Sequence, residues 1–228
     1  MNLFRFYYMN KYIYCAGGFG REVYDIVIRE NSVKCRSQHV FFIDDFLLAG
    51  SEFYGTKILS FSEMLFNINS DDEVIIANGE PENRRILWEK NKACNVKFGK
   101  VIDPSAIVVD SAIINPGCII TAHVIVASNA RISENVVVNV SSIIGHDVQV
   151  DAHSVISSMV NLGGGVHIGA GCYIGMGVQI KEGVSVGDGT IIGMGSIVFN
   201  DIPPGLIALG NPARPMRPNI DKRVFGKH

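Results

Sequence analysis

The 228-residue chain is poor in the features that mark several classes of protein. Its formal net charge is −2 and it has no long basic run, so the composition does not indicate nucleic-acid binding. No apolar stretch reaches the roughly 18 residues that span a bilayer. The five cysteines are odd in number and form no CxxC pair, which disfavours a zinc site or a disulfide framework. We therefore expect no metal, no membrane span and a reducing, cytoplasmic location.

Hydrophobic residues make up 47% of the chain and charged residues 18%, which is typical of a compact globular protein. The first eight residues, MNLFRFYY, are apolar but too short for a signal peptide, and no small-residue cleavage site follows them. We expect this segment to be either an upstream-start extension or a flexible tail.

An internal repeat dominates the second half of the chain, where every sixth residue is aliphatic without a break. These positions are Ile102, Val108, Ile114, Ile120, Val126, Ile132, Val138, Ile144, Val150, Ile156, Leu162, Ile168, Ile174, Ile180, Val186, Ile192 and Val198. Four residues after each of them, from Ala106 to Ser196, the residue is small or β-branched. Two columns of inward side chains, one bulky and one small, predict a narrow prism with a packed axis.

A period of six excludes α-helices and simple amphipathic strands, whose periods are 3.6 and 2. Short strands joined by tight turns satisfy it, and stacked coils would pair like parallel strands. Glycine often follows the aliphatic residue, as at Gly145 and Gly163, and we expect an unusual backbone conformation there.

The [LIV]-G-x4 hexads resemble those of the left-handed β-helix acyltransferases over residues 101–217. In that class three hexads form one triangular coil, which implies five to six coils here. Antifreeze and carbonic-anhydrase-like proteins share such prisms, so the fold alone does not establish acyl transfer.

The segment before the repeat predicts a small parallel α/β unit. Buried strands are expected at Tyr12–Tyr14, Val40–Ile43 and Glu73–Ala77, with a helix after the first strand and another around Trp88. A glycine loop follows the first strand and an acidic pair follows the second: Gly17, Gly18, Phe19, Gly20, Asp44 and Asp45. Such a loop either lets backbone N–H groups approach a phosphate or only makes a tight turn, and its spacing is a weak match to a dinucleotide site.

Together, the AGGFGREV loop, the IDD after the second strand and the GHD within the repeat resemble one branch of the class. That branch contains sialic-acid O-acetyltransferase-like proteins and N-acetyltransferases of UDP- or dTDP-linked 4-amino-4,6-dideoxysugars. The resemblance implies a nucleotide-sugar-binding domain at 9–97, a β-helix acyltransferase domain at 98–217 and a C-terminal tail at 218–228. One departure is Phe19, where this branch often has histidine.

Acetyl transfer needs a base for the nucleophile's proton and donors for the oxyanion. Of six histidines, His146 lies in Ile144-Gly145-His146-Asp147, and taken alone it could be a surface residue at a corner. The resemblance implies that His146 is the base and that Asp147 orients it. Since adjacent residues on a straight strand point to opposite faces, this contact requires a corner between them. His153 and His167 are expected at a surface or an interface.

The resemblance also implies an acetyl-CoA site, a sugar contact from Asn139, and homotrimers with active sites at subunit interfaces. The acetyl-CoA residues are Gly164, Gly175, Met176, Lys181, Asn211, Ala213 and Arg214. The predicted function is N-acetylation of a nucleotide-linked amino sugar in surface-glycan biosynthesis. Two alternatives stay open: a sugar O-acetyltransferase of the sialic-acid type and a non-enzymatic ligand-binding scaffold.

Overall fold

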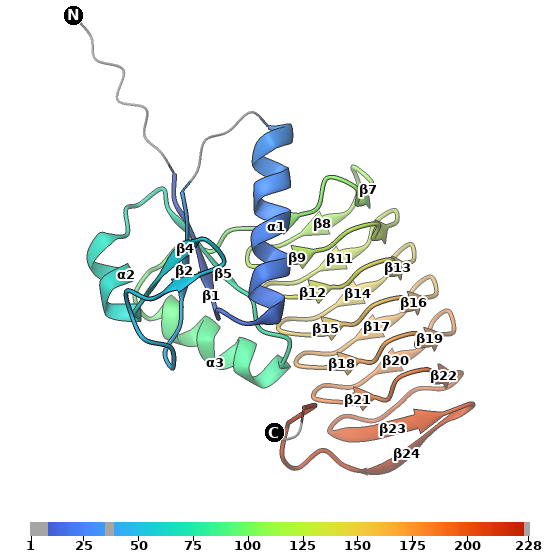
Figure 1. Cartoon of the computed structure of the whole chain (residues 1–228). Helices are drawn as coiled ribbons and strands as arrows, with labels where there is room; N and C mark the ends of the chain where they lie inside the picture. Colours follow the sequence, from blue (N-terminus) through green and yellow to red (C-terminus); the bar gives the residue numbers. More distant parts are fainter. Residues whose placement is uncertain (1–8, 35–38, 226–228) are drawn as a thin grey trace, which may run out of the picture.

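The computed structural model describes residues 9–34 and 39–225. The expectations for residues 1–8 fall outside this range, as do Cys35 and His228. A small α/β domain lies against one side of a long β-helix, as predicted (Figure 1). Within the described residues, no helix is long and apolar enough to cross a membrane.

The α/β domain is built on a five-stranded sheet in the order β3-β4-β2-β1-β5. All neighbours pair in parallel except β3 and β4. The strands are β1 (Lys11–Tyr14), β2 (Val40–Ile43), β3 (Glu52–Phe53), β4 (Thr56–Leu59) and β5 (Glu73–Ile76). The helices are α1 (Gly18–Val33), α2 (Phe61–Asn67) and α3 (Pro81–Lys92). The carboxyl ends of β1, β2 and β5 therefore meet at one edge of the sheet.

The two long helices cover opposite faces of this sheet. Val23, Ile26 and Val27 of α1 pack with Ile13 and its neighbours, at the i, i+3, i+4 spacing of a buried helix stripe. Trp88 of α3 packs on the other face and stacks on Phe98 with ring centroids 3.6 Å apart.

Sequence reasoning missed α2 and the β3–β4 hairpin. The signal for α2 is a capping box: Ser60 Oγ accepts the N–H of Glu63, and the Glu63 carboxylate accepts the N–H of Ser60.

In the β-helix, strands β6 to β22 have two residues each, and each of them ends on one of the predicted aliphatic residues. A six-stranded face contains β7 (Ile107–Val108), β10 (Ile125–Val126), β13 (Ile143–Ile144), β16 (Asn161–Leu162), β19 (Gln179–Ile180) and β22 (Ile197–Val198). A five-stranded face contains β8 (Ile113–Ile114), β11 (Arg131–Ile132), β14 (Gln149–Val150), β17 (His167–Ile168) and β20 (Ser185–Val186). Each strand pairs in parallel with the strand 18 residues later, which confirms three hexads per coil.

The third face is eight-stranded and ends in a hairpin. It contains β6 (Val101–Ile102), β9 (Ile119–Ile120), β12 (Val137–Val138), β15 (Val155–Ile156), β18 (Tyr173–Ile174), β21 (Ile191–Ile192), β23 (Leu206–Gly210) and β24 (Ala213–Pro218). The outward residues Val101, Ile119, Val137 and Val155 are buried against the α1 side of the small domain. This apolar row fixes the domain on the eight-stranded face.

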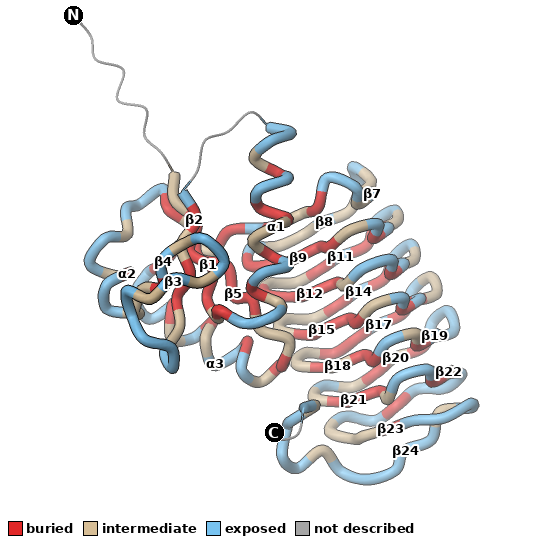
Figure 2. Tube along the Cα trace, in the orientation of Figure 1, coloured by how far each residue is buried: buried red, intermediate tan, exposed pale blue. Residues whose placement is uncertain are grey.

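From Cys118 onwards both inward columns are buried, as Ile144 and Val148 illustrate, and Figure 2 shows buried residues recurring in every central coil. The expectation for the glycines that follow the aliphatic residues was wrong. Gly145 and Gly163 do not have positive φ; the left-handed residue lies two positions later, as at Asp147 and Gly165. Gly145 is small because a Cβ would lie 2.6 Å from the carbonyl oxygen of Leu162 in the next coil.

Candidate active site

The turn that follows β13 brings His146 and Asp147 together. Asp147 has φ 58°, and this corner lets two adjacent side chains converge. His146 Nδ1 lies 2.8 Å from Asp147 Oδ2. Because an ionised carboxylate only accepts hydrogen bonds, Nδ1 carries the proton and Nε2 keeps a lone pair. The contact thus presents Nε2 as a proton acceptor.

Asn129, one coil earlier, supports the carboxylate from the other side. Its Nδ2 donates to Asp147 Oδ1 at 3.2 Å. The hydrogen bond from His146, and after it the one from Asn129, holds the pKa of the Asp147 carboxyl below its ordinary value. Asn129 was not predicted, although its place 18 residues before Asp147 marks it as a neighbour in the coil below.

Gly164, one coil later, keeps Nε2 accessible. A Cβ at this position would lie 2.4 Å from His146 Nε2, so a side chain here would collide with the imidazole. The N–H of Gly164 donates no hydrogen bond to another described residue. A proton acceptor and an open backbone donor therefore lie side by side on one edge of the prism, which we call the His146 edge: the turns that follow the six-stranded face.

The pair is open to solvent in one chain, where the His146 side chain is 70% exposed and that of Asp147 57%. Two other histidines have different surroundings. His167 Nε2 lies 2.8 Å from Asp151 Oδ2 on the five-stranded face. His153 lies at the domain junction, where its Nδ1 is 3.0 Å from Asn135 Nδ2 and burial lowers its pKa.

The predicted nucleotide loop lies at the carboxyl edge of the small sheet. Gly17 is the N-cap residue of α1 and has no side chain that could accept a hydrogen bond from the helix. The first backbone N–H groups of the helix are therefore open. Gly20 is required by packing, since a Cβ there would lie 2.2 Å from the carbonyl oxygen of Cys15. Phe19 packs against the core that α1 shares with the sheet.

The acidic pair divides between two roles. Asp44 Oδ2 accepts the N–H of Ala16 at 2.9 Å, so this carboxylate braces the glycine loop. Asp45 Oδ2 lies 2.8 Å from both the Tyr14 hydroxyl and Lys90 Nζ, which directs Asp45 towards α3. Only Asp44 of the pair touches the loop.

The residues predicted to bind acetyl-CoA lie on two edges of one chain. Gly164 and Lys181 lie on the His146 edge, after β16 and β19. Gly175 and Met176 lie on the edge that follows the eight-stranded face, which we call the Met176 edge. The end of the β23–β24 hairpin, with Asn211 in its turn and Ala213 and Arg214 at the start of β24, lies on this second edge, because the N–H of Gly210 donates to Ser196 Oγ at 3.1 Å. The six-stranded face separates the two sets.

Asn139 also lies on the Met176 edge, after β12. It lines a cavity of about 320 Å³ together with Thr121 and with Glu22, Asp25 and Arg29 of α1. A single chain therefore does not bring Asn139 or the glycine loop to His146, because both lie on the side of the prism that carries the small domain (Figure 1). Among the described residues, no cluster of three or more His, Cys, Asp or Glu side chains could hold a metal ion.

Comparisons with known proteins agree with this architecture. Residues 11–90 match the PglD N-terminal domain family, and residues 165–200 match the bacterial transferase hexapeptide family. No curated protein matches the chain significantly.

Solved structures match nearly the whole chain. WeeI from Acinetobacter baumannii AYE is 28% identical with a TM-score of 0.85, over 91% of this chain and 100% of that one. The acetyltransferase domain of PglB from Neisseria gonorrhoeae FA1090, in complex with acetyl coenzyme A, is 28% identical with a TM-score of 0.84, over 92% and 100%. PerB from Caulobacter crescentus, in complex with CoA and GDP-perosamine, shows the same fold at 23% identity and a TM-score of 0.82, over 91% and 97%. The predicted fold and the resemblance to the hexapeptide-repeat acyltransferases are confirmed.

Proposed function

We propose that this protein, which has the fold and both domains of the hexapeptide-repeat acyltransferases, acetylates the 4-amino group of a nucleotide-linked 4-amino-4,6-dideoxysugar. Acetyl-CoA is the donor, UDP or dTDP is the nucleotide, and the product serves surface-glycan biosynthesis. The observation that carries the proposal is the His146–Asp147 pair with Nε2 facing Gly164. The relatives from Neisseria and Caulobacter, solved with acetyl-CoA or with CoA and a nucleotide amino sugar, support the substrate classes.

The reaction is direct transfer without a covalent acyl-enzyme. His146 Nε2 accepts a proton as the neutral amine nitrogen forms a bond to the thioester carbonyl carbon. The negative charge that develops on the carbonyl oxygen is stabilised by the open N–H of Gly164. When the carbon–sulfur bond breaks, the proton on His146 passes to the CoA thiolate. Asp147 stabilises the transient imidazolium and holds its ring in place.

A trimer completes this site. In the first three coils the outward residues of the six-stranded face form an aliphatic row at Ile107, Ile125 and Ile143, which are 60%, 38% and 40% exposed, and the row continues with Asn161, Gln179 and Ile197. The five-stranded face has one aliphatic outward residue, Ile113, followed by Arg131, Gln149, His167 and Ser185. Exposed apolar rows mark interfaces, and three prisms with this face towards a common axis bring the Met176 edge of one chain to the His146 edge of the next. Both halves of the acetyl-CoA site then share one cleft.

Location in the trimer also explains why the base is exposed in one chain. The neighbouring chain covers His146 and supplies Met176, Asn211, Ala213 and Arg214 along the CoA arm. Lys181 and Arg214 pair with CoA phosphates. Gly17, Gly18, Phe19, Gly20 and Asp44, with Asp45, bind the nucleotide, and Asn139 contacts the sugar.

The test is a CoA-release assay with acetyl-CoA against UDP-, dTDP- and GDP-linked 4-amino-4,6-dideoxysugars and against free and CMP-linked sialic acid. We expect turnover on one of the amino sugars. His146→Ala should lower kcat for that substrate by roughly 10²–10⁴-fold. Turnover on sialic acid alone would reassign the protein to O-acetylation. If no acceptor reacts and acetyl-CoA does not bind, the protein is a scaffold.

A further inference from the structure

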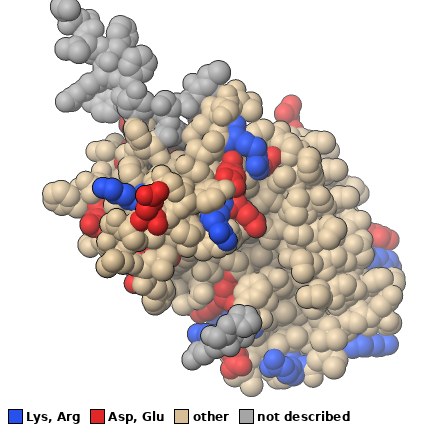
Figure 3. Space-filling view, viewed as in Figure 1, with Lys and Arg blue, Asp and Glu red and all other residues tan. Residues whose placement is uncertain are grey.

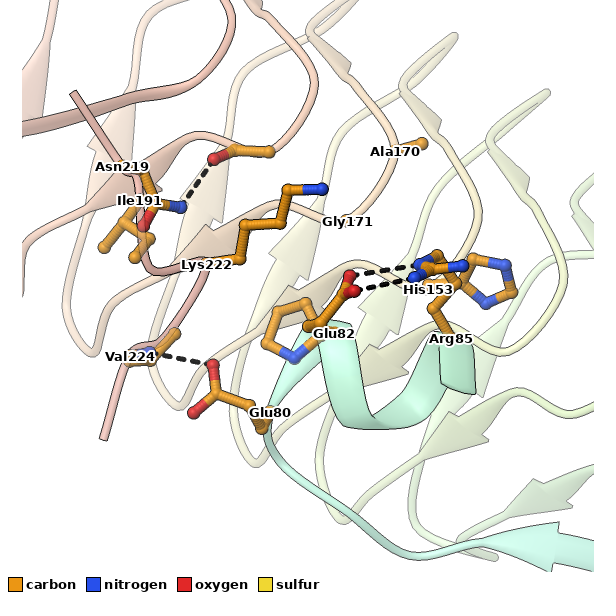
Figure 4. Close-up of a pocket in the computed structure, with 12 residues that line it drawn as sticks. Glu80, Glu82, Arg85, His153, Ala170, Gly171, Ile191, Asn219, Lys222 and Val224 are labelled. Carbon is orange, nitrogen blue, oxygen red and sulfur yellow. Dashed lines mark hydrogen bonds and ion pairs between the residues drawn. The ribbon is translucent and has the colours of Figure 1, made fainter. Parts of the chain in front are cut away.

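The C-terminal segment after β24 returns to the small domain and docks on Glu80. The N–H group of Val224 donates to one carboxylate oxygen of Glu80 at 2.8 Å (Figure 4), and that of Phe225 donates to the other at 3.2 Å. Glu80 is 8% exposed and is the N-cap of α3, yet its side chain does not cap the helix. A buried carboxylate needs hydrogen-bond donors, and the two backbone N–H groups of the segment provide them. Glu80 therefore holds the segment in place.

Two further contacts fix the course of the segment. Asn219 Nδ2 donates to the carbonyl oxygen of Gly189 at 2.8 Å, which ties its start to the β-helix. Phe225 lies edge-on against Tyr173 with ring centroids 5.7 Å apart, and a Cβ at Gly79 would lie 3.8 Å from its ring. The segment thus crosses from the last coils to the loop between β5 and α3.

A polar cavity of about 410 Å³ lies beside this contact, lined by both the segment and the loop. Its walls are Asn78–Glu80 and the first two turns of α3 on one side, and Asp221–Arg223 with Phe225 on the other. The cavity borders the edge that carries the glycine loop, because β1 and β5 are neighbours and Asn78 Nδ2 lies 3.5 Å from Cys15 Sγ. Parallel α/β sheets bind ligands at this carboxyl edge.

Charges of both signs line this cavity: Glu80, Glu82 and Asp221 are acidic, and Lys222 and Arg223 are basic. Arg84 is fully buried behind the loop and donates to the carbonyl oxygens of Ile76 and Asn78, but it has no carboxylate partner within the described ranges. Neither Lys222 nor Arg223 forms a hydrogen bond or ion pair with another described residue, although Lys222 is close enough to Glu82 to help Arg85, the main cause, lower the pKa of that carboxyl. Glu82, by contrast, is already paired with Arg85. Figure 3 shows that much of the visible β-helix surface is uncharged.

We propose that Asp221–Phe225 forms one wall of the nucleotide-sugar site and that Arg223, assisted by Lys222, binds the diphosphate. The guanidinium plane suits bidentate contact with phosphate oxygens, and Arg84 supplies positive potential from behind the loop. This inference rests on the proposed function, because it assumes a nucleotide diphosphate at this edge of the sheet.

The test is calorimetric titration of the full chain with UDP, dTDP and GDP, with uridine, thymidine and guanosine as uncharged probes. Arg223→Ala should weaken binding of the preferred diphosphate by about 10-fold or more and leave binding of acetyl-CoA unchanged. Arg223→Lys should restore part of the loss. Arg217→Ala, an exposed cation on β24 outside the cavity, is the matched control and should stay within about twofold.

The outcomes separate this inference from the function it rests on. If Arg223→Ala binds the diphosphate as tightly as the wild-type chain does, the role of the segment is overturned and the proposed acetylation is unaffected. A wild-type chain that binds acetyl-CoA but none of the diphosphates would overturn the proposed acceptor class, and the inference with it. Equal losses in Arg223→Ala and Arg217→Ala would show general electrostatic attraction and would also overturn the assignment.

Discussion

Replacement of Gly164 by alanine tests the orientation of the base without touching it. The new Cβ would lie 2.4 Å from His146 Nε2 and 2.5 Å from Cε1, whereas ordinary contact begins at 3.4 Å. The imidazole must therefore retreat by about 1 Å, which is enough to break its 2.8 Å contact with Asp147. Misplacement of a catalytic group by this distance costs roughly 10²-fold in rate. We expect kcat to fall by about that factor.

The fold should tolerate this change. Gly164 does not have positive φ, and Ser128 and Glu182 occupy the same hexad position on the same edge with side chains. Surface substitutions of this kind change the free energy of unfolding by less than about 0.5 kcal/mol. Glu182→Ala is the matched control for the edge and should keep its kcat.

The assay is CoA release with the acceptor that the substrate panel identifies, together with thermal melts of each variant. A Gly164→Ala enzyme with kcat within twofold of the wild type and an unchanged melting temperature would refute the assignment of Nε2 as the base. A large fall in the Glu182→Ala control would show instead that the whole edge is sensitive.

Three further predictions follow from separate contacts. Asp147→Asn should lower kcat roughly 10-fold by weakening the charge-assisted hydrogen bond that holds the ring, and steady-state kinetics with circular dichroism as a folding control will check it. Burial lowers the pKa of His153, whose Nδ1 lies 3.0 Å from the Nδ2 of Asn135, an amide that Arg84 orients. Stability should therefore fall as pH drops below about 6.5, where the unfolded histidine protonates before the folded one. Melting curves between pH 8 and 5.5 should show a smaller loss in His153→Gln, and parallel curves would contradict this. Ile143→Glu on the six-stranded face should convert trimers to monomers in sedimentation experiments, whereas Gln149→Glu on the five-stranded face should not; an unchanged assembly in Ile143→Glu would exclude that face as the interface.

The β-helix could be predicted from the sequence because the six-residue hydrophobic period directly gives the length of each side of a coil. Every sixth residue from Ile102 to Val198 ends a strand, and a shift of 18 residues is one coil. The small domain was predicted less completely, because α2 and the β3–β4 hairpin depend on local turn chemistry. The Ser60–Glu63 capping box was readable but lies in a segment without strong hydrophobic periodicity.

The details of the site were harder to predict because they depend on backbone geometry. Sequence reasoning asked for a corner between His146 and Asp147, and the positive φ of Asp147 provides it. It assigned the wrong physical reason to the glycines after the aliphatic residues, since close approach of the next coil, rather than a special φ, excludes a side chain at Gly145. It also could not foresee that Asp45 pairs with Lys90, because α3 follows Asp45 by more than thirty residues.

The same repeat that gives the fold also builds the edge that carries the proposed base. Ser128, His146, Gly164 and Glu182 occupy equivalent positions in four successive coils, so each lies directly above the previous one. Their backbones are nearly interchangeable, and the chemistry comes from the contrast in side-chain size. One coil carries the imidazole of His146, and the next coil leaves space for it because Gly164 has no side chain. A base can thus be placed on a regular prism without an inserted loop, provided that a neighbouring prism closes the cleft.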